Sequence, residues 1–169
     1  MSIFNVSSVI KNIETSASIA IRAKAVDLNK QGENVISFAT GEPDFDTPEN
    51  IKKAAKHAIN IGFTKYTAVD GIDDLRKAIC YKLKIDNNLV YATNEIIVSN
   101  GAKQALYNTF RTICNPGDHV IVPTPCWVTY PEQIKLTGAI PIFTCSDESN
   151  NFKLTVDELK KKITKKLEE

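Results

Sequence analysis

The sequence predicts an α/β fold with an incomplete sheet of parallel type. From residue 95 onward, apolar runs of strand length at 95–98, 119–122 and 140–143 alternate with helical patterns at 102–114 and 130–136. Such alternation is typical of parallel strands joined by crossover helices. The turn Asn115-Pro116-Gly117-Asp118 and the residue Gly138 close these two helices, so the predicted elements are separate.

The composition excludes several classes of protein. The chain has 169 residues, 21 Lys+Arg against 20 Asp+Glu, and 43% hydrophobic residues, which is close to the globular average. A charge near zero argues against a nucleic-acid partner. No apolar run approaches the roughly 18 residues of a membrane span, and the first residues do not follow a signal-peptide pattern.

The cysteines and histidines predict neither a disulfide framework nor a metal site. The four cysteines, Cys80, Cys114, Cys126 and Cys145, form no CxxC pair, and the chain has only two histidines. Dispersed thiols fit a reducing compartment, so we expect a cytoplasmic protein.

The remaining elements follow from helix signals. We expect helices over 16–31 and 72–85, and a strand over 35–38. Thr47 is the expected N-cap of a third helix, with Pro48 at its first position and Gly62 at its end. Thr155 followed by Glu158 predicts the start of an amphipathic helix in the stretch 153–169. We expect residues 1–45 to form an arm with part of a small domain, and residues 46–169 to form a truncated large domain.

The junction of the first predicted strand and its helix is a candidate anion site. Gly101 follows the strand and precedes Ala102 and Lys103, so free N–H groups of the helix start converge there. A phosphate is a common occupant of such a site. The alternative is that Gly101 serves only a tight turn, since the segment has neither a GxGxxG fingerprint nor a Walker loop.

Trp127, the single tryptophan, follows the second predicted strand at the same edge of the sheet. Ligands of open α/β sheets bind at that edge, and an indole can stack on a planar heteroaromatic ring. A partly buried core tryptophan is the alternative. Two loop residues are weaker candidates: Gly41 offers an unobstructed N–H, and Tyr66 lies in the loop 62–66.

Five segments occur in a specific order and together resemble the N-terminal part of class I aminotransferases. They are Gly-Glu-Pro-Asp-Phe-Asp-Thr-Pro at 41–48, Thr-Lys-Tyr at 64–66, Asn-Gly-Ala-Lys-Gln-Ala-Leu-Tyr-Asn at 100–108, Pro-Gly-Asp at 116–118 and Pro-Cys-Trp-Val-Thr-Tyr-Pro at 125–131. The similarity is closest to the bacterial aspartate (aspartate/prephenate-type) branch. It extends over essentially the whole chain and implies the N-terminal part of a fold-type I transferase large domain.

The resemblance also implies a cofactor and roles for individual residues. Pyridoxal 5′-phosphate would carry an amino group between an amino acid and a 2-oxo acid. Aspartate is the amino acid that the resemblance implies. Gly101, Ala102 and Lys103 would bind its phosphate, and Trp127 would stack on its ring. Gly41 would meet the substrate carboxylate. Tyr66 would reach the cofactor of a second subunit in a homodimer. Pro125 matches a proline that is often cis.

Two residues and one missing segment depart from the family pattern. Cys126 stands where near relatives carry Tyr, and Glu14 stands where prephenate-using members carry Lys, so we expect no prephenate activity. The Schiff-base lysine of the family would lie beyond Glu169, so we expect no catalytic residue in this chain and no activity of the chain alone. A non-catalytic remnant or module that pairs with a full-length aminotransferase subunit is the alternative.

Overall fold

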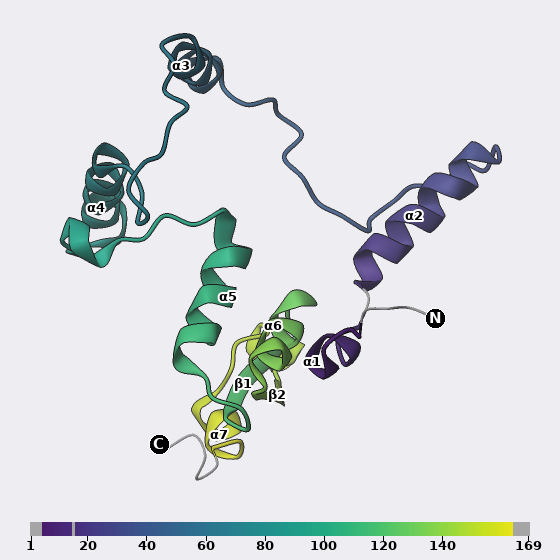
Figure 1. The fold of residues 1–169 in the computed structure, drawn as a ribbon. Helices are drawn as coiled ribbons and strands as arrows, with labels where there is room; N and C mark the ends of the chain where they lie inside the picture. The colour runs from purple at the N-terminus through teal and green to yellow at the C-terminus, as the bar shows by residue number, and fades with distance from the viewer. Residues whose placement is uncertain (1–4, 15, 164–169) are drawn as a thin grey trace. The chain divides into compact units, whose positions relative to one another are not determined.

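The computed structural model describes residues 5–14 and 16–163, which belong to two units (Figure 1). Unit 1 comprises residues 1–40 and 101–169, and unit 2 comprises residues 41–100. The expected division into an arm with part of a small domain, and a large domain from residue 46, stays a prediction.

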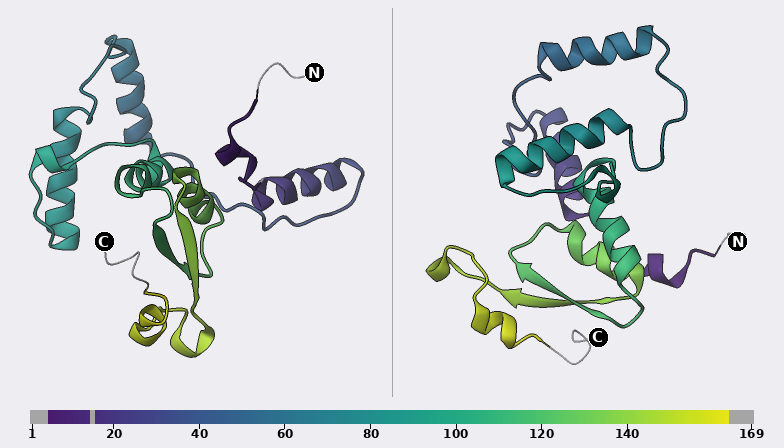
Figure 2. Two further views of the ribbon diagram at one scale, coloured as in Figure 1. Left: turned by 60° about the horizontal axis from the view of Figure 1, so that its bottom comes forward. Right: turned by 90° about the vertical axis from the view of Figure 1, so that its left-hand side faces the viewer.

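Unit 1 contains a two-stranded parallel sheet. Strand β1 (His119–Thr124) pairs in register with β2 (Ile140–Cys145), so that His119 lies opposite Ile140 and Thr124 opposite Cys145. Helix α6 (Thr129–Thr137) connects the two strands and packs on both of them (Figure 2). The predicted parallel pairing, two of its strands and the helix between them are therefore confirmed.

A small apolar core holds this βαβ unit together. Val122 of β1, Ile134 of α6 and Ala139 before β2 are buried in one cluster, and helix α5 (Gly101–Ile113) contributes the partly buried Phe110. Burial of an aliphatic side chain of this size contributes about 1.5–3 kcal/mol. Helix α6 ends at Gly138, whose φ of +87° is the left-handed conformation of a glycine C-cap.

The two ends of the chain add one long helix, α2 (Ala17–Lys30), and three short elements to unit 1: α1 (Ser8–Lys11), η2 (Glu148–Asn150) and α7 (Val156–Lys160). Helix α2 confirms the helix expected over 16–31. The Thr155 hydroxyl accepts the N–H of Glu158 at 3.2 Å, which confirms the predicted start of α7. The helix nevertheless ends at Lys160, earlier than expected, and residues 164–169 lie outside the described part of the chain.

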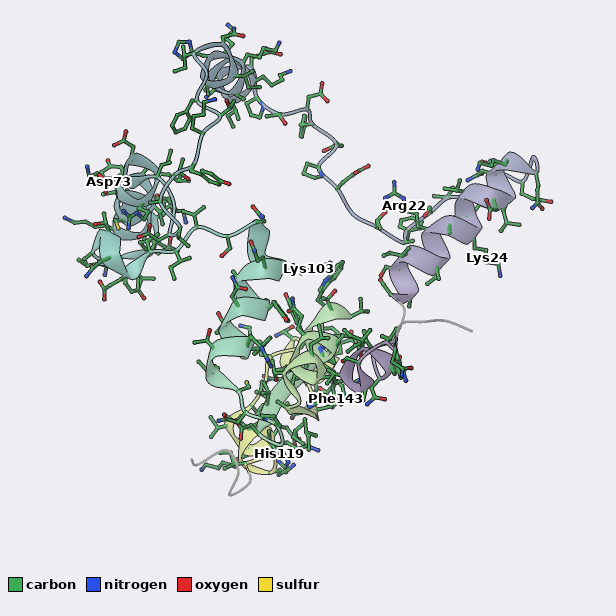
Figure 3. The ribbon with its side chains drawn as sticks, viewed as in Figure 1. Arg22, Lys24, Asp73, Lys103, His119 and Phe143 are labelled. Atoms are coloured by element: carbon green, nitrogen blue, oxygen red, sulfur yellow. The ribbon has the colours of Figure 1, made fainter. Side chains whose placement is uncertain are left out.

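Unit 2 contains α3 (Glu49–Asn60), α4 (Asp73–Asn87) and the short turn η1 (Thr93–Glu95). Both long helices were predicted, but the N-cap of α3 is Pro48 rather than Thr47. Arg76 of α4 (which begins at Asp73, labelled in Figure 3) donates to the Asp70 carboxylate and, at 3.3 Å, to the Thr93 carbonyl. This side chain therefore ties the loop before α4 to the segment after it.

Two predicted strands are wrong. Residues 35–38 have no regular structure, and residues 96–98 follow η1 without pairing to another strand. The Val98 N–H donates instead to the Asp70 carbonyl at 3.0 Å, and Ile97 is 74% exposed. Apolar, β-branched residues favour extended backbone, but a strand also needs a partner, and neither segment has one among the described residues.

Candidate functional site

The start of α5 is open around its first residue. Gly101 is the first residue of α5 and has a φ of +77°, and a Cβ added there would meet nothing within 4 Å. The leading N–H groups of any α-helix have no partner inside the helix. In α5 those groups belong to Gly101, Ala102 and Lys103, so the backbone offers several donors beside an unobstructed space.

The first turn of α5 is braced by Gln133 of α6, a residue that the sequence analysis did not identify. Its Nε2 donates to the Lys103 carbonyl at 2.6 Å, and the residue is only 4% exposed. Its Oε1 is buried and has no partner among the described residues. A buried amide that reaches a helix backbone fixes the position of that turn. The only signal in the sequence was that Gln133 lies next to Ile134 on the inward face of α6.

Trp127 lies between β1 and α6. The peptide bond Thr124–Pro125 is cis, as the resemblance implies for Pro125, and two residues later the Trp127 carbonyl accepts the N–H of Tyr130 at 3.1 Å. Trp127 is 51% exposed and lines a hollow of about 530 Å³ together with Leu106 and Phe110 of α5. The residue is therefore not a buried core tryptophan, and about half of its surface is available to a ligand.

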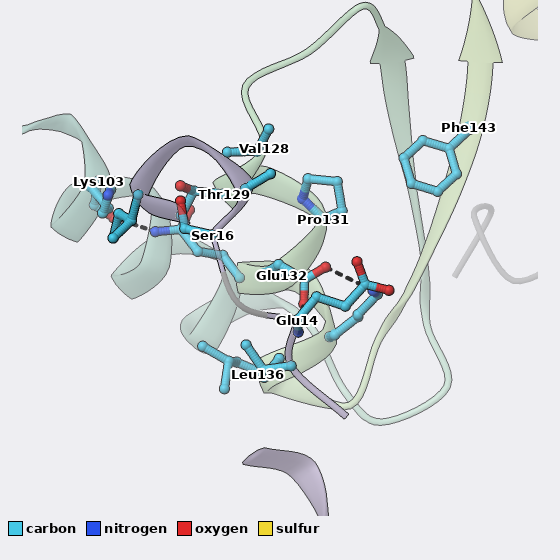
Figure 4. A pocket seen from close by; sticks show the side chains of 14 residues that line it. Glu14, Ser16, Lys103, Val128, Thr129, Pro131, Glu132, Leu136 and Phe143 are labelled. Atoms are coloured by element: carbon cyan, nitrogen blue, oxygen red, sulfur yellow. Dashed lines mark hydrogen bonds and ion pairs between the residues drawn. The ribbon is translucent and has the colours of Figure 1, made fainter. Parts of the chain in front are cut away.

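The first turn of α5 and the start of α6 border one cavity of about 620 Å³ (Figure 4). Lys103 lines it from α5, and Val128 and Thr129, which directly follow Trp127, line it from the start of α6. Of the predicted site residues, only Lys103 lines this cavity, whereas Trp127 lines the separate hollow of about 530 Å³.

The wall of this cavity carries charges of both signs. Glu14 lines it, and its backbone N–H donates to the Glu132 carboxylate at 3.1 Å. That carboxylate also forms an ion pair with Lys135 at 2.7 Å, whereas Lys103 adds a second ammonium group to the lining. Carboxylates on the wall disfavour a second anionic group on a ligand, while the lysines favour one.

The other two predicted site residues belong to unit 2. Gly41 lies in a segment without regular structure, and a Cβ added there would meet nothing within 4 Å. Tyr66 is fully exposed and lines a shallow hollow of about 290 Å³ with Thr64 and Lys65. Both residues are accessible within their own unit, and their roles stay predictions.

Comparison with known proteins identifies a family that the chain matches. Residues 33–169 match the family model for aminotransferase class I and II. The chain is 48% identical over 161 residues to a protein named probable aspartate/prephenate aminotransferase from Rickettsia typhi, a match that covers 95% of this chain and 40% of that protein. It is 47% identical over 157 residues to the aspartate aminotransferase of Bacillus sp. strain YM-2, with 93% and 40% covered.

Solved structures show the same similarity. The aspartate aminotransferase of Rhizobium meliloti matches with a TM-score of 0.92 at 42% identity, over 97% of this chain and 41% of that one. The aspartate aminotransferase of Thermus thermophilus, solved with maleate, matches with a TM-score of 0.92 at 38% identity, over 98% and 43%. These matches confirm the predicted fold class, the N-terminal part of a fold-type I transferase.

The chain spans about two-fifths of the length of the relatives it matches. The family match itself extends over most of the 169 residues, from residue 33 to residue 169. The chain therefore belongs to the aminotransferase class I and II family.

Proposed function

We propose that this chain forms the part of an aspartate aminotransferase-like enzyme that holds the phosphate and the ring of pyridoxal phosphate. One observation carries the proposal: Lys103, in the first turn of α5 that begins at the unobstructed Gly101, borders the same cavity as the residues directly after Trp127. When bound, pyridoxal phosphate supplies an electron-withdrawing ring that acts as an electron sink while an amino group moves between an amino acid and a 2-oxo acid.

The donor set of α5 fits a phosphate dianion. The N–H groups of Gly101, Ala102 and Lys103 and the positive end of the helix dipole favour a doubly charged anion. The missing Cβ of Gly101 leaves room for its oxygens. Gln133 holds the turn through the Lys103 carbonyl, so these donors are positioned before a ligand arrives.

The indole of Trp127 fits a flat, electron-poor ring. About half of the residue is exposed, so one part of it packs on unit 1 while another remains open. Stacking on such a ring orients it relative to the phosphate held by α5. The residues of this chain thus bind and orient the cofactor and exclude water from one side of it.

Substrate, partner and compartment are further parts of the proposal. We propose that Gly41 binds the substrate carboxylate, that aspartate is the amino donor, and that Tyr66 completes the site of a second copy in a homodimer. We also propose that the 169 residues alone bind the cofactor without turnover, because the resemblance assigns the covalent lysine to a segment beyond Glu169.

The four free thiols favour the cytoplasm. No helix in the described residues has the length and apolar character to cross a bilayer.

Removal of one backbone donor tests the proposal. Proline is tolerated in the first turn of a helix but has no N–H, so Ala102→Pro removes a donor and preserves α5. A hydrogen bond to a charged group contributes about 1.5–3 kcal/mol, so the affinity for pyridoxal phosphate should fall about 10- to 100-fold in a titration followed by Trp127 fluorescence.

The control is Val156→Pro, which removes an N–H from the first turn of another helix, α7, and should leave the affinity unchanged. Pyridoxal without its phosphate should bind the wild-type chain more weakly and should not distinguish the two variants. Equal affinities of the Ala102→Pro and Val156→Pro chains for pyridoxal phosphate would refute the phosphate role of α5.

A further inference from the structure

We propose that Asn100 is a site of spontaneous deamidation, and that the carboxylate formed there weakens the binding of a phosphate at the start of α5. The chemical step needs water and two residues that are neighbours in the chain, Asn100 and Gly101. Its effect on binding rests on the proposed function, because it concerns the N–H groups that would hold the phosphate of pyridoxal phosphate.

The step is an attack of a backbone nitrogen on a side-chain amide. The nitrogen of Gly101 forms a bond to Cγ of Asn100, the bond from Cγ to Nδ2 breaks, and ammonia leaves with the proton of the attacking nitrogen. The product is a cyclic imide. Water then opens the imide at either carbonyl and leaves an aspartate or an isoaspartate, so the amide is hydrolysed overall and nothing is oxidised or reduced.

The local structure leaves the attacking nitrogen accessible. Gly101 is the first residue of α5, and the leading N–H groups of a helix have no partner inside it. A glycine has no Cβ to hinder the approach of the side chain, and even an added Cβ would meet nothing within 4 Å. Asn100 is exposed, so water reaches the imide.

The chain contains a second acidic or amide residue before a glycine, and its environment differs. The Gly71 N–H, which follows Asp70, donates to the Ala68 carbonyl at 3.1 Å. The Asp70 carboxylate accepts a hydrogen bond from Arg76. Both reacting groups of this pair are therefore held by other partners, which disfavours the same ring closure there.

Asn94 is a comparable asparagine without a glycine after it. It is also exposed, but the next N–H, of Glu95, donates to the Ala92 carbonyl at 3.0 Å. That nitrogen must give up a hydrogen bond of about 1 kcal/mol before it can attack. The structure therefore favours deamidation at Asn100 over Asn94.

The new carboxylate lies directly before the donors of α5. The leading N–H groups and the positive end of the helix dipole attract a carboxylate at this position, so it competes with phosphate for Gly101, Ala102 and Lys103. It also repels a phosphate dianion, and the affinity should fall about tenfold or more. The isoaspartate product in addition lengthens the main chain before Gly101 and displaces its N–H.

Ageing of the purified chain at alkaline pH tests the modification site. Peptide mass spectrometry should show conversion of amide to acid at Asn100 at least about fivefold faster than at Asn94, since release of a hydrogen bond of about 1 kcal/mol changes a rate by that factor. Asn100→Gln should be modified slowly, because its longer side chain closes a less favourable ring. An unmodified Asn100, or equal rates at Asn100 and Asn94, would overturn the proposal.

Binding is measured separately, on variants that need no ageing. Asn100→Asp should bind pyridoxal phosphate about tenfold or more weakly than the wild type, whereas Asn94→Asp, with the same change in charge, should bind as tightly. Ageing should weaken binding by the wild-type chain and not by Asn100→Gln, which keeps the test independent of the folding of Asn100→Asp. Equal affinities of the two aspartate variants would overturn the effect on binding. If the unaged wild-type chain does not bind pyridoxal phosphate, the proposed function is refuted, whereas the peptide masses still decide where deamidation occurs.

Discussion

Trp127 is the residue whose environment most directly bears on ligand binding. It is half exposed in a unit whose core is small, and its carbonyl is fixed by the N–H of Tyr130. The hydrogen bond fixes the backbone from which the indole projects, so the backbone does not have to be ordered when a ring stacks on the side chain. This exposure is the property that distinguishes a ligand platform from a core tryptophan.

Truncation of this side chain should weaken cofactor binding. We expect Trp127→Ala to lower the affinity for pyridoxal phosphate by about 2- to 12-fold, since stacking contributes about 0.5–1.5 kcal/mol. Trp127→Phe should retain part of this affinity. Equilibrium dialysis with absorbance of the cofactor measures both variants. Phe152→Ala, at another exposed aromatic residue of unit 1, is the control, and a loss of equal size there would contradict a specific role for Trp127.

At the scale of single elements, helices and strands differed in how well the sequence predicted them. The starts of α2, α6 and α7 and the stops of α2 and α6 depend on residues inside or next to each helix, such as Gly138 and Thr155, and were predicted to within a residue or two. Residues 96–98 have the composition of a buried strand but no partner strand. Gln133 was missed for the same physical reason, because its role depends on a contact with α5, 30 residues away.

The C-cap of α6 provides a test at the level of one element. Gly138 has a φ of +87°, and a Cβ there would lie 3.2 Å from the Pro116 Cα. Gly138→Ala should therefore destabilise unit 1 by about 1 kcal/mol or more, since it adds a steric contact to an unfavourable φ. Chemical denaturation followed by circular dichroism measures this change. Gly32→Ala is the control for the effect of φ alone, because Gly32 has a φ of +93° and a Cβ there would meet nothing within 4 Å. This substitution should lower the free energy of unfolding by less than Gly138→Ala does.

The first turn of α4 provides a pH-dependent test. A hydrogen bond from Lys77 lowers the pKa of Asp73 below its usual value of 3.8. The folded chain therefore binds this proton less readily than the unfolded chain, so the stabilisation is present above the unfolded pKa and is lost as the pH falls through the lower folded value. Helicity measured by circular dichroism should decline over that acidic range. In Asp73→Asn this part of the decline should be absent, and an identical acid profile would contradict the assignment.

At the scale of the whole molecule, the amount of buried apolar surface is small. Among the described residues, the buried apolar ones are Ala25, Val122, Ile134 and Ala139. All four lie in unit 1, and no residue of unit 2 is buried. Many large apolar side chains of both units are instead exposed, including Ile51 and Ile59 on one face of α3. Apolar surface left in water contributes nothing to folding, so the secondary structure of unit 2 depends on local interactions.

The chain made alone should consequently have low and uneven stability. Domains of ordinary stability unfold at a cost of about 5–15 kcal/mol, and we expect the 169-residue chain to fall below that range, with a broad urea transition. Helices without a packed face are marginal in water, so protease cleavage should begin in residues 41–100 and should reach the βαβ unit of residues 119–145 last. The open edge of β1 should also favour aggregation as concentration rises. A sharp, reversible thermal transition of a monomer, with both units equally resistant to protease, would show that the exposed apolar faces are covered in a way that the described contacts do not provide.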